Sequence, residues 1–137
     1  MNPAPANDAI ADYFHAVDLI TPNETELEIF GGVEELFRRG IRKVVTTLGG
    51  RGYEIADVRG HKVYPCRKVD VVDTTATGDT LCGGLAVGLA DGKSLEASCF
   101  FGSLAASLAC TKRGAQQSVP SKAEVLQAGS DVTKTRS

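Results

Sequence analysis

The 137-residue sequence has no tryptophan, one methionine, two histidines and four scattered cysteines, and neither sign of charge is in large excess. A formal net charge of −2 supplies no basic field for nucleic acid, so a polyanion partner is not expected. The cysteines form no CxxC pair, and no His/Cys cluster has the spacing of a zinc site. These absences argue against nucleic-acid binding and against zinc, and they favour cysteines that serve as small buried residues.

Long apolar runs are also missing. The opening residues MNPAPANDAIADYF lack the basic start and continuous apolar core of a secretory signal, and later apolar stretches are broken by Gly, Ser and Asp. We therefore expect a soluble protein of the reducing cytoplasm that has no membrane partner. With 42% hydrophobic and 23% charged residues, the chain can form one ordinary globular domain.

Helical and strand-like segments alternate along the chain. The spacing of apolar residues predicts a helix around 10–17, then a short strand cut by Pro22, then two short helices within 23–40. β-Branched runs in 41–73, separated by GGRG and DVRG, predict two or three strands joined by tight turns. This alternation favours an α/β fold in which helices pack on the faces of a sheet.

The last third of the chain returns to helical spacing. One helix is expected within 78–92, and a second is expected from an N-cap at Ser94 to a stop at Gly114. A short helical stretch from Ser121 precedes a polar tail, 126–137, that we expect to be flexible. The ordered domain is accordingly predicted to span 1–125.

The stretch VDTTATGDTLCGGL, residues 72–85, joins small polar residues and an acid to the start of an apolar helix. The amides of a first helical turn, together with a helix dipole of about half a positive charge, can face a phosphoryl group. Asp79 beside such a group could accept the proton of an attacking alcohol. Alternatively, Asp79 merely caps the helix and the glycines pack it closely. The stretch is no Walker loop, because Gly-Lys-Ser/Thr does not follow.

The same stretch resembles the C-terminal signature of the ribokinase-type (PfkB-type) sugar kinase family. The stretches NPAPA, TPNETELE, TLGGRG and CTKRGAQQSVPS occur in the family's order, and the resemblance runs to about Glu124. It implies the C-terminal half of a ribokinase-like three-layer sandwich, with a mostly parallel sheet and flanking helices. It also implies an ATP-dependent kinase that phosphorylates a primary hydroxyl of a small sugar, with ribose the leading candidate.

Other functions remain open beside this one. A family member that acts on fructose or on a nucleoside fits the same stretches, because the residues that read the sugar are not among them. A non-catalytic or degenerate nucleotide-binding module, which needs a partner chain, is the alternative from a different class.

The resemblance implies a role for each of its motifs. Asp79 resembles the catalytic base, and the amides of Ala76, Thr77 and Gly78 resemble the anion hole. Asn23 and Glu26 resemble a pair that organises Mg²⁺-bound water and phosphate; their structural alternative is an Asx turn with an acid at a helix start.

Thr47, Gly49 and Gly52 resemble a strand-end loop that approaches the nucleotide; otherwise they form a plain hairpin turn. The sequence departs from the family at Thr77, where Ala is usual, and at Ser103, where Asn or His often lies near the adenine. A β-branched residue restricts its backbone, so we expect an altered anion hole.

A K⁺ site is also implied by the resemblance. Family members hold the ion with oxygen atoms of two loops, and hard oxygen ligands suit such a cation. Without the resemblance, the corresponding residues are only loop and helix C-cap. They are Asp73, Thr75, Ala109, Lys112, Gly114 and Ser118.

The sequence begins inside the family's pattern, whose full members are roughly twice as long, near the size limit of single domains. The lid and most sugar contacts belong to the part that has no counterpart here, so we expect slow turnover or none from this chain alone. About a dozen residues, a mean helix length, are also missing between ELEIFGG and VEELFRRG. An exposed sheet edge would favour a homo-oligomer.

Overall fold

The structure, a computed structural model, describes residues 1–135. The chain folds as two compact units, Met1–Pro65 and Cys66–Ser137. The single domain over 1–125 therefore stays a prediction. Among the described residues, no helix has both the length and the apolar character that a bilayer crossing requires.

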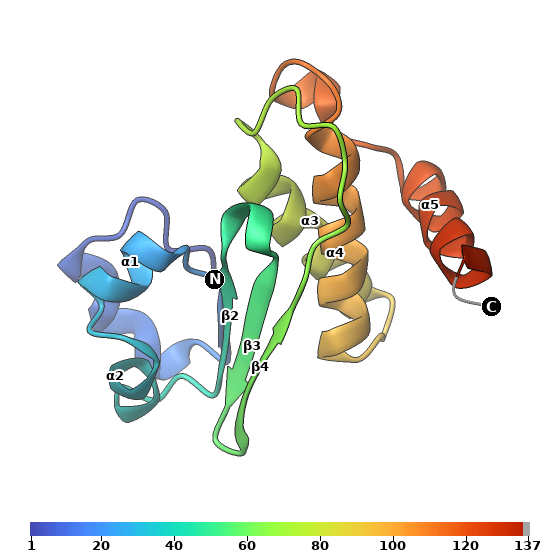
Figure 1. The fold of residues 1–137 in the computed structure, drawn as a ribbon. Coiled ribbons are helices and arrows are strands. Elements are labelled where there is room, and N and C mark those ends of the chain that lie inside the picture. The colour runs from blue at the N-terminus through green and yellow to red at the C-terminus, as the bar shows by residue number, and fades with distance from the viewer. Residues whose placement is uncertain (136–137) are drawn as a thin grey trace. The chain divides into compact units, whose positions relative to one another are not determined.

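The first unit contains a four-stranded sheet (Figure 1). Its strands follow one another across the sheet in chain order, with the first pair parallel and the other two pairs antiparallel. The α/β class is confirmed, and 41–73 contains three of the two or three strands expected there. The prediction of a mostly parallel sheet is wrong for this unit, because short turns reverse the chain between the last three strands and make them antiparallel. The strands are β1 (Leu19–Ile20), β2 (Lys43–Thr47), β3 (Tyr53–Asp57) and β4 (Gly60–Tyr64).

Short helices complete this unit and supply its core. Phe14 and Phe30 are buried and meet edge to face with ring centroids 5.2 Å apart, and Leu36 and Val44 belong to the same buried cluster. The segment expected to be helical around 10–17 is a 3₁₀-helix. The helical elements are η1 (Asp8–Ala16), α1 (Glu24–Ile29), α2 (Val33–Arg38) and the short η2 (Gly49–Arg51).

The second unit is helical. Ser94 caps one of its helices by accepting the Ala97 N–H at 3.2 Å, as predicted. That helix ends at Ala109 rather than near Gly114, because the carbonyl of Cys110 accepts the N–H groups of Val72 and Asp73 instead of continuing the helix. The elements are α3 (Thr77–Ala90), α4 (Leu95–Ala109), η3 (Gln116–Ser118) and α5 (Lys122–Thr135).

The helix expected from Ser121 is confirmed as α5. The backbone N–H and the hydroxyl of Ser121 donate to Glu124 Oε2 at 2.7 and 2.8 Å, which satisfies the helix start. Residues 126–135 of the tail that we expected to be flexible are helical here, and 136–137 lie outside the described residues.

Helices α3 and α4 pack side by side through their backbones (Figure 1). A Cβ atom on Gly84 would lie 2.6 Å from the Gly102 Cα, and one on Gly88 would lie 2.7 Å from the Ser98 Cα. Both separations are far inside van der Waals contact. The glycines of α3 therefore set how closely the two helices approach.

A pair of adjacent substitutions tests this packing. We expect Gly84→Ala to lower the free energy of unfolding by about 1–3 kcal/mol, because the added methyl group must push the helices apart. Gly83→Ala is the matched control, since a Cβ there meets no atom within 4 Å. It should leave stability unchanged or raise it by up to about 1 kcal/mol. Urea unfolding measures both, and equal stability of the two variants would contradict the packing argument.

Candidate functional site

The start of α3 carries the predicted base. Asp79 lies in the first turn of this helix and is exposed. The N-cap residue is Ala76, and no side chain caps this helix end. Asp79 is therefore not the N-cap residue, but the structural alternative, an acid in the first turn that interacts favourably with the helix dipole, remains beside the role of base.

The predicted anion hole is only partly available for an anion. The Thr77 N–H donates to the carbonyl of Thr74 at 3.2 Å, and the Ala76 carbonyl accepts the Thr80 N–H at 2.9 Å as the first helical bond. The amide of Gly78 lies in the first turn, where helix geometry provides no acceptor. One of the three predicted donors is thus engaged in a turn.

Asp73 joins the two loops predicted to hold a cation. Its Oδ1 accepts the Thr75 N–H at 2.9 Å and the Thr75 hydroxyl at 2.6 Å, and its Oδ2 accepts the Gly114 N–H at 3.1 Å. These hydrogen bonds, that from the Thr75 side chain foremost, lower the pKa of the Asp73 carboxyl from 3.8 to about 2. The carboxylate is therefore ionised at neutral pH, which fits a cation site.

The other predicted cation residues lie in the segment after α4. The Ala109 carbonyl accepts the Lys112 N–H at 3.1 Å, and the Ser118 hydroxyl donates to the Ala115 carbonyl at 2.8 Å. Lys112 Nζ lies 3.2 Å from Glu124 Oε1. In the described part of the chain, no group of three or more His, Cys, Asp or Glu side chains could hold a metal ion.

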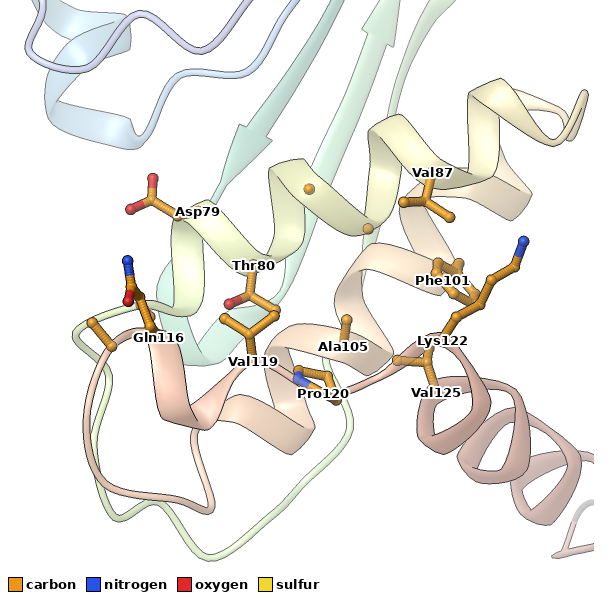
Figure 2. A pocket seen from close by; sticks show the side chains of 14 residues that line it. Asp79, Thr80, Val87, Phe101, Ala105, Gln116, Val119, Pro120, Lys122 and Val125 are labelled. Carbon is orange, nitrogen blue, oxygen red and sulfur yellow. The ribbon is translucent and has the colours of Figure 1, made fainter.

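A pocket of about 410 Å³ opens beside Asp79, entirely within the second unit (Figure 2). Figure 2 shows Asp79 and Gln116 at one end and Lys122, paired with Asp91 at 2.6 Å, toward the other. The walls between are mostly apolar, but the Oγ1 atom of Thr80 is buried in them with no hydrogen-bond partner from the protein. The other lining residues are Ala76, Gly83, Gly84, Val87, Phe101, Ala105, Ala115, Val119, Pro120 and Val125.

Ser103 lies elsewhere on the same unit. It occupies the middle of α4, is 7% exposed, and its backbone carbonyl accepts the Ser107 hydroxyl at 2.9 Å. It is not among the residues that line the pocket. Its predicted place near an adenine therefore stays a prediction.

In the first unit, Asn23 and Glu26 form a capping box at the start of α1. Asn23 Oδ1 accepts the Glu26 N–H at 2.8 Å, and Glu26 Oε2 accepts the Asn23 N–H at 2.9 Å. This arrangement is the structural alternative considered for the pair. A role in organising Mg²⁺-bound water and phosphate stays a prediction, in which Glu26 Oε1 and the remaining lone pairs would accept hydrogen bonds from that water.

The loop after β2 lies next to that capping box. The Thr47 N–H donates to the Pro22 carbonyl at 2.9 Å, and Thr47 forms a parallel bridge with Asn23. Gly49 and Gly52 have positive φ angles of 57° and 110°, which allow the tight connection from β2 to β3. The loop is thus a hairpin connection whose first residue sits beside Asn23.

The predicted site residues form two groups, one within each unit. Asn23, Glu26, Thr47, Gly49 and Gly52 belong to the first unit, and all the others belong to the second. Sequence reasoning missed Cys110, Gln116 and Lys122. Gln116 and Lys122 flank the proline turn of GAQQSVPSK, whereas Cys110 has no sequence signal because its contacts are long-range.

Comparison with known proteins identifies the family. The model of the pfkB family carbohydrate kinases matches residues 1–122. The chain belongs to the pfkB family.

Relatives within the pfkB family include ribokinases. The ribokinase of Haemophilus influenzae is 37% identical over an alignment of 139 positions, which covers 93% of this chain and 45% of that protein. A crystal structure of ribokinase from Thermotoga maritima superposes with a TM-score of 0.86 at 35% identity, over 93% of this chain and 47% of that one.

A second solved structure contains ligands. Arabidopsis thaliana ribokinase complexed with ribose and ATP gives a TM-score of 0.79 at 30% identity, over 86% of this chain and 42% of that one. The ribokinase-like fold is thereby confirmed. The chain spans less than half the length of these relatives and corresponds to their C-terminal part.

Acid titration tests the Asp73 network. Because the folded-state pKa of Asp73 lies near 2, below its ordinary value of 3.8, the ionised carboxylate stabilises the fold above pH 4 and this contribution is lost as the pH falls toward 2. Asp73→Asn should therefore lower stability at pH 7 and flatten the decline between about pH 4 and pH 2. Thermal unfolding against pH measures this, with Asp70→Asn as the control in the same segment. An unchanged acid decline in Asp73→Asn would refute the network.

Proposed function

We propose that this chain supplies the phosphoryl-transfer part of an ATP-dependent pfkB-family kinase that phosphorylates a primary hydroxyl of a small sugar, with ribose as the leading acceptor. Ribokinase relatives at 37% identity and the relative solved with ribose and ATP support the proposal. The observation that carries it is Asp79, exposed in the first turn of α3 at the rim of an open pocket.

In the proposed reaction, Asp79 accepts the proton of the sugar hydroxyl. The resulting oxygen attacks the γ-phosphorus of ATP, the bond to the β-phosphate oxygen breaks, and ADP leaves with the electron pair. The Gly78 amide and the positive end of the α3 dipole face the charge that develops on the phosphoryl oxygens. Asp79 is thus the group whose loss should slow the chemistry most.

Two cations complete the proposal. Mg²⁺, near Asn23 and Glu26, would neutralise the phosphate oxygens of ATP. K⁺ would take oxygen ligands from Asp73, Thr75 and the segment that contains Gly114. Asp73 suits this role because its hydrogen bonds keep the pKa of its carboxyl near 2 and because it already connects the two loops.

A second candidate function is a nucleotide-binding module without catalysis of its own. The observation that favours it is length, because the chain spans 45% of the Haemophilus influenzae ribokinase. Such a module would bind ATP and require a partner chain for turnover. In either case we propose a reducing compartment, the cytoplasm, because none of the four cysteines is disulfide-bonded in the structure.

Removal of the base tests the proposed reaction. We expect Asp79→Asn to reduce ribose-dependent ATP consumption by about 10²–10⁴-fold, the usual contribution of a general base, with ATP affinity nearly unchanged. Glu96→Gln is the matched control, because Glu96 is likewise an exposed acid in a first helical turn, that of α4. The assay contains Mg²⁺ and K⁺, and calorimetry measures ATP binding. Turnover preserved in Asp79→Asn would overturn the assignment, whereas ATP binding without turnover in the wild type would favour the second candidate.

The Mg²⁺ role of Glu26 can be separated from its capping role. Glu26→Gln keeps an acceptor for the Asn23 N–H, because Gln also forms capping boxes, so stability should change by less than about 0.5 kcal/mol. Loss of the charge should nevertheless weaken Mg²⁺-dependent ATP binding by about tenfold or more, as for other hydrogen bonds to charged groups. Glu28→Gln, an exposed position on the same helix, is the control. If ATP binding depends on Mg²⁺ equally in Glu26→Gln and in the wild type, then Glu26 serves only to cap α1.

A further inference from the structure

Cys110, the residue that follows α4, contacts both ends of the short loop 72–77 that leads into α3. Its carbonyl accepts the Val72 N–H at 2.8 Å and the Asp73 N–H at 3.1 Å. Its Sγ atom lies 3.2 Å from the Oγ1 of Thr77, the first residue of α3. One residue therefore holds the loop where it begins and where it turns into the helix.

The two kinds of contact depend differently on the side chain. Any residue at position 110 offers a carbonyl to Val72 and Asp73. The contact with Thr77 needs a side chain that can form a hydrogen bond, and Cys110 is only 8% exposed, so water does not readily replace the thiol. Loss of the thiol would leave the partly buried Thr77 hydroxyl without this partner.

The held segment carries the groups on which the proposed function depends. Asp73 and Thr75 form the predicted cation loop, and Thr77 leads directly to Gly78 and Asp79. Displacement of reacting groups by about 1 Å can reduce a rate by about a hundredfold. A contact that sets the position of Thr77 therefore also sets the position of the amide and the carboxylate that follow it.

We propose that Cys110 is a positioning residue of the phosphate-binding loop, which it anchors through its carbonyl at Val72 and Asp73 and through its thiol at Thr77. The statement that this loop binds phosphate rests on the proposed function. The anchoring of the loop by Cys110 does not. Cys110 touches no reacting atom in this scheme and acts through Thr77.

Amide hydrogen exchange tests the anchoring without any ligand. Cys110→Ala should raise exchange across residues 72–77 by about three- to tenfold, the effect of one lost hydrogen bond, and Cys110→Ser should restore protection. Cys99→Ala is the matched control, since Cys99 is a fully buried cysteine of α4 that makes no described contact with this loop. Unchanged exchange in Cys110→Ala, or equal exchange in Cys110→Ala and Cys99→Ala, would overturn the proposal.

Calorimetric titration with Mg·ATP tests the link to the site. Cys110→Ala and Thr77→Ala should each weaken binding by a similar factor of about three to ten, and the double variant should be no weaker than either single one, because both remove the same contact. Cys110→Ser should recover the affinity, and Cys99→Ala should not lose it. Additive losses in the double variant would overturn the coupling. If the wild type binds no ATP, the proposed function fails, and the exchange measurement alone decides whether Cys110 anchors the loop.

Discussion

The backbone contact between α3 and α4 is the constraint on which the second unit depends. Gly84 lies so close to Gly102 that a single added carbon would overlap the partner helix. Glycine normally weakens a helix, yet both helices keep it where they cross. The close approach brings the start of α3 and the end of α4 together, so Asp79 and Cys110 lie at the same end of the helix pair.

This geometry gives the loop before α3 its hydrogen bonds. The loop has few apolar side chains, so long-range bonds to the Cys110 carbonyl and thiol and from the Gly114 N–H determine its shape. Hydrogen bonds from the Thr75 side chain, the Thr75 N–H and the Gly114 N–H stabilise the Asp73 carboxylate over the acid and lower its pKa. The Gly114 N–H therefore contributes both to the shape of the loop and to the charge of Asp73.

Local patterns in the sequence predicted what depends on neighbours in the chain. Ser94 was predicted as an N-cap from its place before an apolar run, and the structure confirms it. The end of α4 was predicted too late, because a carbonyl that bonds to residues almost 40 positions earlier leaves no local signal. The turns GGRG and DVRG were predicted correctly, but the strand directions came from the family resemblance, which describes a larger sheet than the one formed by residues 19–64.

The candidate site shows the same division between local and long-range effects. The spacing of Asn23 and Glu26 is consistent with a capping box and with a metal-organising pair, and the structure shows the box. In the proposed function, phosphate and Mg²⁺ would have to share those side chains with α1. Thr77 was expected to alter the anion hole through its branched side chain. Its hydroxyl instead contacts Cys110 and its amide bonds to Thr74. The hydrogen bonds of Thr77 therefore hold the start of α3, and Gly78 rather than Thr77 is the amide that the proposed reaction would use at a phosphoryl group.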